Sequence, residues 1–492
     1  MKKFKLIVTL LFFGFVTNSC DENDLFVNNP NELSPESFFA TGPQVESAVN
    51  AVYANLQTIG LYSRGMFFMM DNLAHENAGN SQLEADKLQY LNFSFDSSHG
   101  LIGAYWESCY RGINKANFVI ENQEKINAIS DNLLSTARKD KYVGEAKFLR
   151  ALFYFFLVTR FGDVPLIVDL SGEEKPRAAA ADVYALIVAD LQDAQNALLE
   201  KGSDDIGRAT RGAATALLGK VYLFMDNKPA ALAEFNKIYG QYSLEDDFYD
   251  NFTEEGEHGP ESIFEIQYDD ELGTAAQWNS DVSGEGANEA TFRGQEYGLL
   301  NWFNVYPSDR LLDEYEAGDP RYQATFYSVG DTYSAGVITE GNLTAGSQRR
   351  AGWRKYQNYY KDASEDQESG INFNYLRYAD VLLMMAECTY ESDPGAAIGY
   401  INEVRQRPSV DLAPLSASGM STQDIFEAIV HERMVELAGE QIRFNDIIRW
   451  GIASTALEGT NFREDIHTLL PIPDREIGTN SLIGPEDQNP GY

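Results

Sequence analysis

The sequence has few of the residues that bind metal ions or cross-link a small fold. It contains three cysteines, Cys20, Cys109 and Cys388, and five scattered histidines. A disulfide framework or a zinc site needs more ligands than these. Cys109 and Cys388 each lie in an apolar helical pattern, so a bridge between them and two buried free thiols both remain open. No EF-hand pattern supports a calcium ion. We therefore expect no metal and no cofactor.

Patterns typical of hydrolases are also missing. His431-Glu432 begins like a zinc-protease helix, but the position of the second histidine is occupied by Val435. The chain has no GxSxG turn to hold a nucleophilic serine. Its 75 acidic residues could supply a glycosidase pair almost anywhere, so none is singled out. We expect a protein that is not an enzyme.

Positive charge is scarce. The chain has 38 Lys and Arg against 75 Asp and Glu, which gives a formal net charge of −37. Nucleic acid is a poor partner because phosphate binding requires a basic surface. Polyanionic glycans are disfavoured for the same reason. Neutral ligands fit this composition better.

The N-terminus reads as a secretory signal covering residues 1–19. Lysines at positions 2, 3 and 5 precede a mostly apolar stretch from Leu6 to Val16, which is too short to span a bilayer. The following Thr17-Asn18-Ser19-Cys20 resembles a bacterial lipoprotein processing site, with Thr17 in place of the usual leucine. Loss of the signal would make the net charge −40.

Cys20 is the predicted lipidation site. Several acyl chains on one cysteine anchor a protein stably, whereas a single chain does not. The acidic run 21–24 that follows looks like the signal that sends some Gram-negative lipoproteins to the outer face of the outer membrane; a plain acidic linker is the alternative reading.

Helical periodicity dominates the rest of the chain. Apolar residues recur at three- and four-residue spacing in 44–59, 104–129, 140–161, 181–199, 211–225, 229–239, 376–390 and 397–404. Tight turns join these helices in pairs, with small residues where helices would cross, as in tetratricopeptide hairpins. No clean 34-residue repeat is visible, so the units must be degenerate.

Two stretches interrupt the helical pattern, at 62–100 and about 241–370. Both are rich in polar turn residues and aromatics, and the second contains only short strand-like runs, at 262–268 and 321–329. Long aromatic-rich loops on a helical scaffold are usually functional. No Pro- or Ser-rich linker is evident, so we expect one continuous body.

The run from His431 to Trp450 reads as one continuous amphipathic helix. Glu432, Glu436, Glu440 and Arg443 recur on it at three- and four-residue spacing. With large apolar neighbours, these groups should form ion pairs that are partly buried between helices. We interpret the run as architecture and not as a catalytic site.

Several segments, in order along the chain, resemble the SusD/RagB family of outer-membrane lipoproteins. They are YRGINKANFVIE (110–121), GEAKFLRALFYFFLVTRFGDVPL (144–166), RATRGAATALLGKVYLF (208–224), PSDRLLDEYEAGDPRY (307–322), NYLRYADVLLMMAEC (374–388), HERMVELAGEQIRFNDIIRWG (431–451), LLPIPDREI (469–477) and the terminal QNPGY.

The resemblance implies a mainly α SusD-like fold, with degenerate tetratricopeptide-type hairpins supporting an irregular, loop-rich ligand-binding region with short strands. It implies an N-terminal part, 20–240, and a C-terminal part, 241–492, that includes the loop-rich region 241–370. It further implies a surface lipoprotein that captures neutral oligosaccharide and delivers it to a SusC-type TonB-dependent transporter. The alternative is a non-catalytic module that binds proteins or peptides.

Sugar rings present apolar faces that pack on flat aromatic side chains, with polar side chains around the rim. Aromatics outside helical patterns are therefore the candidate ligand contacts, and the two loop regions correspond in order to the aromatic platform of the family. Trp106, Trp353 and Trp450 are interpreted as structural. The predicted glycan-binding residues are Trp278, Trp302, Tyr297, Phe292, Phe93, Phe95, Asn279 and Asn301.

Overall fold

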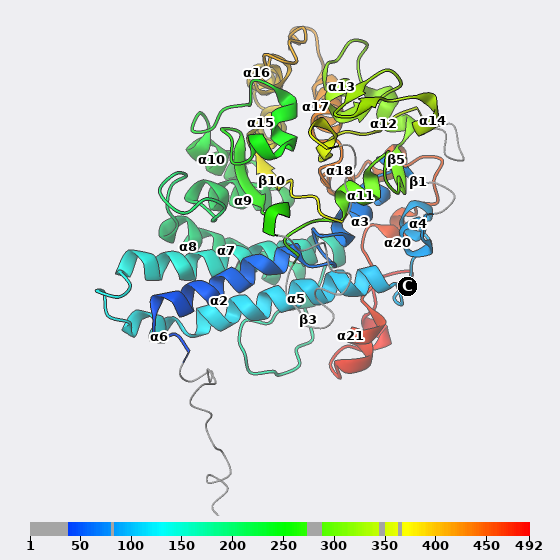
Figure 1. Cartoon of the computed structure of the whole chain (residues 1–492). Coiled ribbons are helices and arrows are strands. Elements are labelled where there is room, and N and C mark those ends of the chain that lie inside the picture. The colour runs from blue at the N-terminus through cyan, green and yellow to red at the C-terminus, as the bar shows by residue number, and fades with distance from the viewer. Residues whose placement is uncertain (1–37, 80–82, 273–287, 344–349, 363–366) are drawn as a thin grey trace, which may run out of the picture.

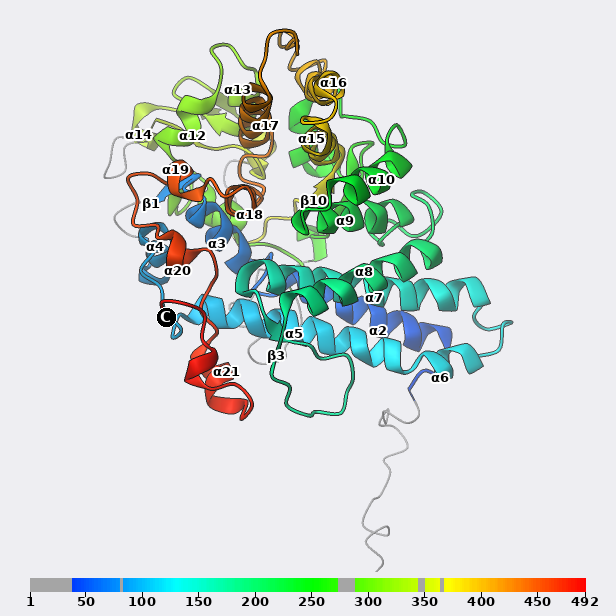
Figure 2. The ribbon, with the colours of Figure 1, turned by 180° about the vertical axis from the view of Figure 1, so that it is seen from behind.

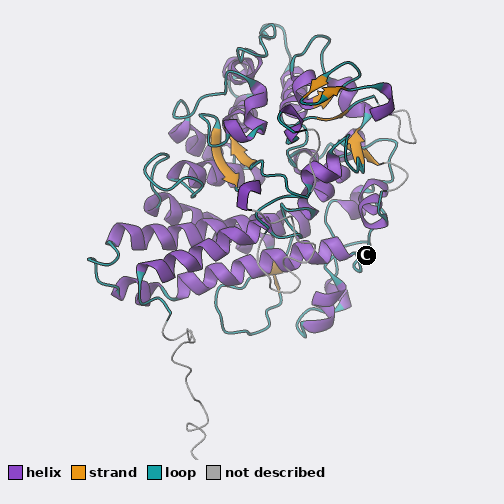
Figure 3. Ribbon diagram, viewed as in Figure 1, coloured by secondary structure: helices purple, strands orange, loops and turns teal. Residues whose placement is uncertain are grey.

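The computed structural model describes residues 38–79, 83–272, 288–343, 350–362 and 367–492. The signal segment and the predicted lipidation site Cys20 lie outside these residues. Helices make up most of the described chain, and strands occur only as short pairs (Figure 3). The predicted mainly α architecture is therefore confirmed.

Four long helices form the base of the molecule (Figure 1). They are α2 (Gly42–Ala54), α5 (Gly100–Glu121), α7 (Thr136–Phe161) and α8 (Ala180–Ala197). Helix α7 packs against α2, α5, α8 and α9 (Arg211–Phe224), which is why it is buried on nearly all sides. Its close approach to α5 requires a glycine, because a Cβ at Gly112 would lie 2.3 Å from the Phe153 ring.

Paired helices stack on this base (Figure 2). The pair α9 and α10 (Lys228–Ile238) is followed in space by α15 (Tyr378–Thr389), α16 (Pro394–Arg405) and α17 (Thr422–Glu436). The turn between α9 and α10 is encoded locally: Asp226 adopts a φ of 56°, and the Asn227 side chain accepts a hydrogen bond from the Ala230 amide at 3.2 Å. The predicted hairpins are therefore present.

Short elements surround this scaffold. Each ladder has two antiparallel strands: β1 (Asn77–Gly79) with β5 (Val305–Pro307), β2 (Val164–Pro165) with β3 (Arg177–Ala178), β4 (Ser262–Ile266) with β10 (Phe373–Arg377), β6 (Phe326–Tyr327) with β9 (Gly352–Trp353), and β7 (Thr332–Tyr333) with β8 (Gly336–Val337). The remaining helices are α3 (Gly65–Leu73), α4 (Ala85–Asn92), α6 (Gln123–Ala128), α11 (Arg293–Tyr297), α12 (Asp309–Glu314), α13 (Arg321–Thr325), α14 (Glu340–Leu343), α18 (Arg443–Arg449), α19 (Ala453–Ala456), α20 (Glu464–His467) and α21 (Asp474–Thr479).

Two of the predicted elements differ from the structure. Of the strand expected over 321–329, only β6 forms; the first part is helix α13, because the Asp319 carboxylate accepts the Arg321 amide at 2.9 Å and starts a helical turn. The helix expected over 431–450 breaks into α17 and α18 at Gly439, which has a φ of 71°. Both peptide groups of Gly439 are used there, since its amide donates to Glu76 and its carbonyl accepts from Arg293.

The ion pairs expected from the end of α17 are present and fully buried. The Glu436 carboxylate accepts from Arg321 at 3.0 Å and from both Arg377 and Arg407 at 2.7 Å. The buried ion-pair cluster around it consists of Glu261, Asp319, Arg321, Lys355, Arg377, Arg405, Arg407, Glu432, Glu436 and Glu440. Its members come from segments that are far apart in the sequence, and the cluster therefore fixes how those segments meet.

Cys109 and Cys388 are free, buried thiols, which decides between the two arrangements left open by the sequence. Burial raises the pKa of Cys388 to about 12, so this thiol is a poor nucleophile. Within the described ranges, no helix has the length and apolar character needed to cross a membrane.

Replacing Glu436 should destabilise the protein. Glu436→Gln leaves three buried guanidinium groups without their shared countercharge, and we expect a loss of about 3–5 kcal/mol in the free energy of unfolding. Chemical denaturation measures this loss. Glu427→Gln, at an exposed position on the same helix, is the matched control and should change stability by less than about 0.5 kcal/mol. Equal stability of the two variants would contradict the structural role of the cluster.

Stability should also fall steeply in acid. Burial opposes ionisation of Glu261, but Arg407 and Arg377 outweigh it and lower the pKa of Glu261 to about 2; Arg407, Arg377 and Arg321 likewise hold the pKa of Glu436 well below its usual value. Such groups stabilise the fold above the unfolded pKa of about 4.3, and this contribution is lost as the pH falls toward 2. Urea midpoints between pH 4.5 and 2.5 should drop less for Glu436→Gln than for Glu427→Gln.

Candidate glycan-binding surface

The structure buries the two predicted rings of the first loop region. Phe93 and Phe95 are only 5% and 4% exposed. The C-terminal tail covers them: the Phe95 ring stacks on Tyr492 with centroids 6.0 Å apart, and the Phe93 ring contacts Phe462 at 5.4 Å. The expectation that these rings face solvent is wrong, because segments almost 400 residues away in the sequence fold back over them.

Phe292 and Tyr297 are buried as well, at the two ends of α11. Both have no exposed surface and pack in one apolar cluster with Trp353. The Tyr297 hydroxyl donates to Asp71 at 2.9 Å and accepts from the Asn77 side chain at 2.9 Å. A ring with these contacts cannot stack on a sugar, so the predicted ligand role of both residues is corrected to a structural one.

Trp302 is the predicted ring that the structure leaves accessible. Its side chain is 44% exposed, beside Asn301, which is partly exposed. Trp278 and Asn279, which were predicted alongside them, lie outside the described residues. We call Asn301, Trp302, Tyr306 and Tyr333 the Trp302 surface.

A hydrogen-bonded turn between α11 and β5 presents Trp302. The Asn301 amide donates to the Gly298 carbonyl at 3.0 Å, and the Trp302 amide donates to the Gln295 carbonyl at 3.1 Å. Phe303, the next residue, adopts a φ of 48°, which reverses the chain toward the strand. The indole is therefore carried by a backbone whose conformation is fixed before any ligand arrives.

A buried ion pair anchors this turn to the rest of the molecule. Glu296 accepts from the Arg64 Nε at 2.6 Å, and its other oxygen accepts from the Asn304 side chain at 2.5 Å. Arg293, at the start of α11, donates to the Gly439 carbonyl at 2.8 Å. The turn is thereby linked to the segment between α17 and α18.

A small apolar cluster lies next to Trp302 in the chain, since it contains Leu299 and Phe303 from the same turn. Tyr306 and Tyr333 are partly exposed at its edge, and the Tyr306 ring meets Phe303 at 6.0 Å. Sequence reasoning missed these two tyrosines, although both lie in the loop-rich region beside strand or turn signals. The buried members of the cluster are Leu299, Phe303, Tyr327, Ile338, Leu343 and Tyr359.

The surface offers an exposed indole and two partly exposed phenol rings, which can contact the apolar face of another ring. In the part of the chain that the structure describes, no group of three or more His, Cys, Asp or Glu side chains could hold a metal ion.

Two family models match the chain. The SusD family model matches residues 260–468, and a SusD-like model described as "Starch-binding associating with outer membrane" matches residues 27–223. The chain belongs to the SusD/RagB family. This agrees with the helical hairpins and the short strand pairs described above.

Full-length relatives and solved structures support the same assignment. This SusD/RagB protein is 29% identical to SusD-like protein P2 of Formosa agariphila, with 100% of both chains covered. A SusD superfamily protein from Bacteroides vulgatus has the same fold, with a TM-score of 0.77 at 24% identity over 92% of this chain and 100% of that one. A laminarin-binding SusD-like protein gives a TM-score of 0.74 at 25% identity over 92% of this chain and 100% of that one.

Because Phe95 is buried and Trp302 is exposed, their replacement by alanine should affect stability differently. Phe95→Ala should lower the free energy of unfolding by about 3–5 kcal/mol, because it empties a site enclosed by other rings. Trp302→Ala should cost less than about 1 kcal/mol, because much of its ring already faces solvent. Thermal and urea denaturation of the two variants tests this. A larger loss for Trp302→Ala than for Phe95→Ala would contradict the assigned exposures.

Proposed function

We propose that this SusD/RagB protein captures neutral oligosaccharides at the cell surface and delivers them to a SusC-type TonB-dependent transporter. In this proposal, acyl chains on Cys20 anchor it to the outer membrane with the binding surface facing outward, and the protein has no catalytic activity. The family assignment and the laminarin-binding relative support the ligand class.

The accessible indole of Trp302 is the single observation on which the ligand site depends. Flat aromatic faces pack on the apolar C–H faces of sugar rings, and a fixed turn spares the cost of ordering the contact on binding. In this proposal, the tyrosine hydroxyls of the Trp302 surface and the side-chain oxygen of Asn301 form hydrogen bonds with the sugar hydroxyls; the Asn301 amide nitrogen is buried.

Charge supports a neutral ligand. The formal net charge is −37, and Arg321, Lys355, Arg377 and Arg407 are committed to buried ion pairs. Buried carboxylates balance these cations, so the net negative charge is carried by the rest of the chain. A polyanionic glycan would therefore meet long-range repulsion, whereas an uncharged glucan would not.

Binding measurements on Trp302→Ala test the proposal. Isothermal titration with neutral oligosaccharides from laminarin and starch should show binding by the native protein. Trp302→Ala should weaken it tenfold or more, roughly 1.4 kcal/mol. Tyr239→Ala, which removes a similarly exposed ring from the end of α10, is the matched control and should bind as the native protein does.

Two results would count against the proposal in different ways. Equal affinity of Trp302→Ala and the native protein would remove the site assignment. Binding of peptides, with no binding of any oligosaccharide in the panel, would favour the alternative of a peptide-capturing module.

A further inference from the structure

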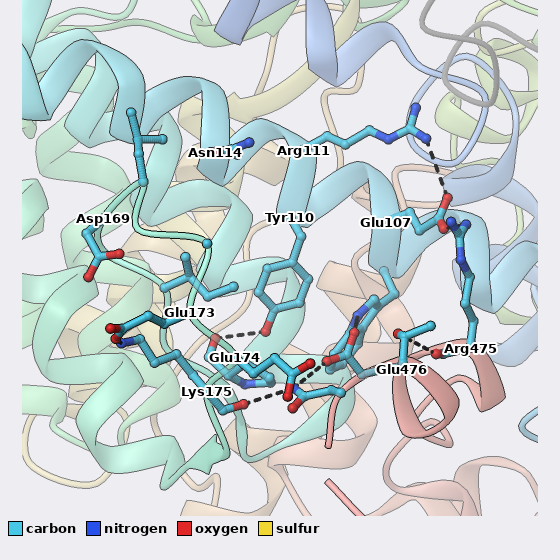
Figure 4. Close-up of a pocket in the computed structure, with 17 residues that line it drawn as sticks. Glu107, Tyr110, Arg111, Asn114, Asp169, Glu173, Glu174, Lys175, Arg475 and Glu476 are labelled. Carbon is cyan, nitrogen blue, oxygen red and sulfur yellow. Dashed lines mark hydrogen bonds and ion pairs between the residues drawn. The ribbon is translucent and has the colours of Figure 1, made fainter. Parts of the chain in front are cut away.

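A cavity of about 560 Å³ lies apart from the Trp302 surface and shares no lining residue with it. It opens between α5, the segment 165–175 that follows β2, and α21 (Figure 4). In Figures 1 and 2 alike, β3 and α21 lie low in the molecule, whereas β1, which pairs with the strand after Trp302, lies high. The volume falls in the range of about 300–1,000 Å³ that is usual for ligand sites.

The floor of this cavity is aromatic and fixed in place. Trp106 and Tyr110, one turn apart on α5, have ring centroids 5.0 Å apart. Trp106 packs edge-on against Phe161 at 4.8 Å and donates to Glu476 at 3.3 Å. The Tyr110 hydroxyl donates to the Pro165 carbonyl at 2.8 Å, and its ring remains partly exposed.

The rim carries both donors and acceptors. Figure 4 shows Asp169, Glu173 and Lys175 on one side of the cavity and Arg111, Glu107 and Arg475 on the other. Glu107 lies between the two arginines: it pairs with Arg475, and Arg111 lies 3.6 Å from it.

Asn114, one turn after Tyr110 on α5, is exposed and lines the cavity. Its amide can therefore both donate to and accept from a ligand. The carboxylates of the rim accept hydrogen bonds and its guanidinium groups donate them. A ligand hydroxyl group can both donate and accept, so it can bond to any of these side chains.

Charge narrows the ligand class. Five carboxylates and three basic side chains line the cavity, so it carries a net negative charge. This charge would repel a polyanion, whereas it would not repel an uncharged polyhydroxylated molecule. The exposed Leu170 and the Tyr110 ring offer apolar surface for the C–H face of a sugar.

We propose that this cavity is a second carbohydrate-binding site for a neutral oligosaccharide segment, with Tyr110 as the stacking face and Arg111 and Asn114 as hydrogen-bonding groups. The inference rests on the proposed function, because it assumes that the protein binds glycans. A polymer can engage both sites where a short fragment engages one, which raises retention of the polymer without new contacts.

Titration in a Trp302→Ala background separates the two sites. With the neutral laminarin or starch oligosaccharide that the native protein binds best, the native protein should bind two molecules and Trp302→Ala one. Adding Arg111→Ala and Asn114→Ala should weaken the residual binding more than tenfold. Adding Arg463→Ala and Asn127→Ala, which remove the same side-chain types at exposed positions away from the cavity, should leave it unchanged.

Three other results of this titration would contradict the second site, the proposed function or both. Binding of one molecule that Trp302→Ala abolishes would overturn the second site and leave the proposed function intact. Residual binding that is insensitive to Arg111→Ala and Asn114→Ala would also overturn it. Absence of binding by the native protein would overturn both.

Discussion

The fold depends on the burial of charged side chains that must find partners. Glu436 meets three arginines that arrive from α13, from the end of β10 and from just after α16. A buried charge without a partner costs several kcal/mol, so these segments have one arrangement that satisfies the cluster. Arg293 and Glu76 bond to Gly439, next to the cluster, and thereby connect it to α11 and β1. The turn that carries Trp302 starts from this connection.

The net negative charge of the protein lies outside this cluster. The cluster joins five cations to five carboxylates, so it leaves the formal net charge of −37 to the rest of the chain. Uncharged ligands are the class that this charge does not repel. Aromatic rings held by fixed backbone, Trp302 on its turn and Tyr110 on α5, supply contact area that needs little ordering on binding.

Much of the scaffold follows from sequence patterns that act locally. The apolar periodicity of 140–161, 211–225 and 229–239 predicts α7, α9 and α10. The exposed residues of the candidate site were predicted less well from the sequence. Phe93 and Phe292 lie in loop-like sequence, yet the first is covered by the C-terminal tail and the second lies in an apolar cluster. Trp302 has the same kind of neighbourhood in the sequence and is exposed.

The sequence by itself determined the helical hairpins, the family and the sign of the surface charge, because each depends on spacing, motif or composition. Only the tertiary structure decided which rings reach solvent, where the helix after His431 breaks, and that Arg321 enters a buried cluster. Those features depend on contacts between residues tens to hundreds of positions apart. Burial is a property of the packed chain, and no local pattern encodes it.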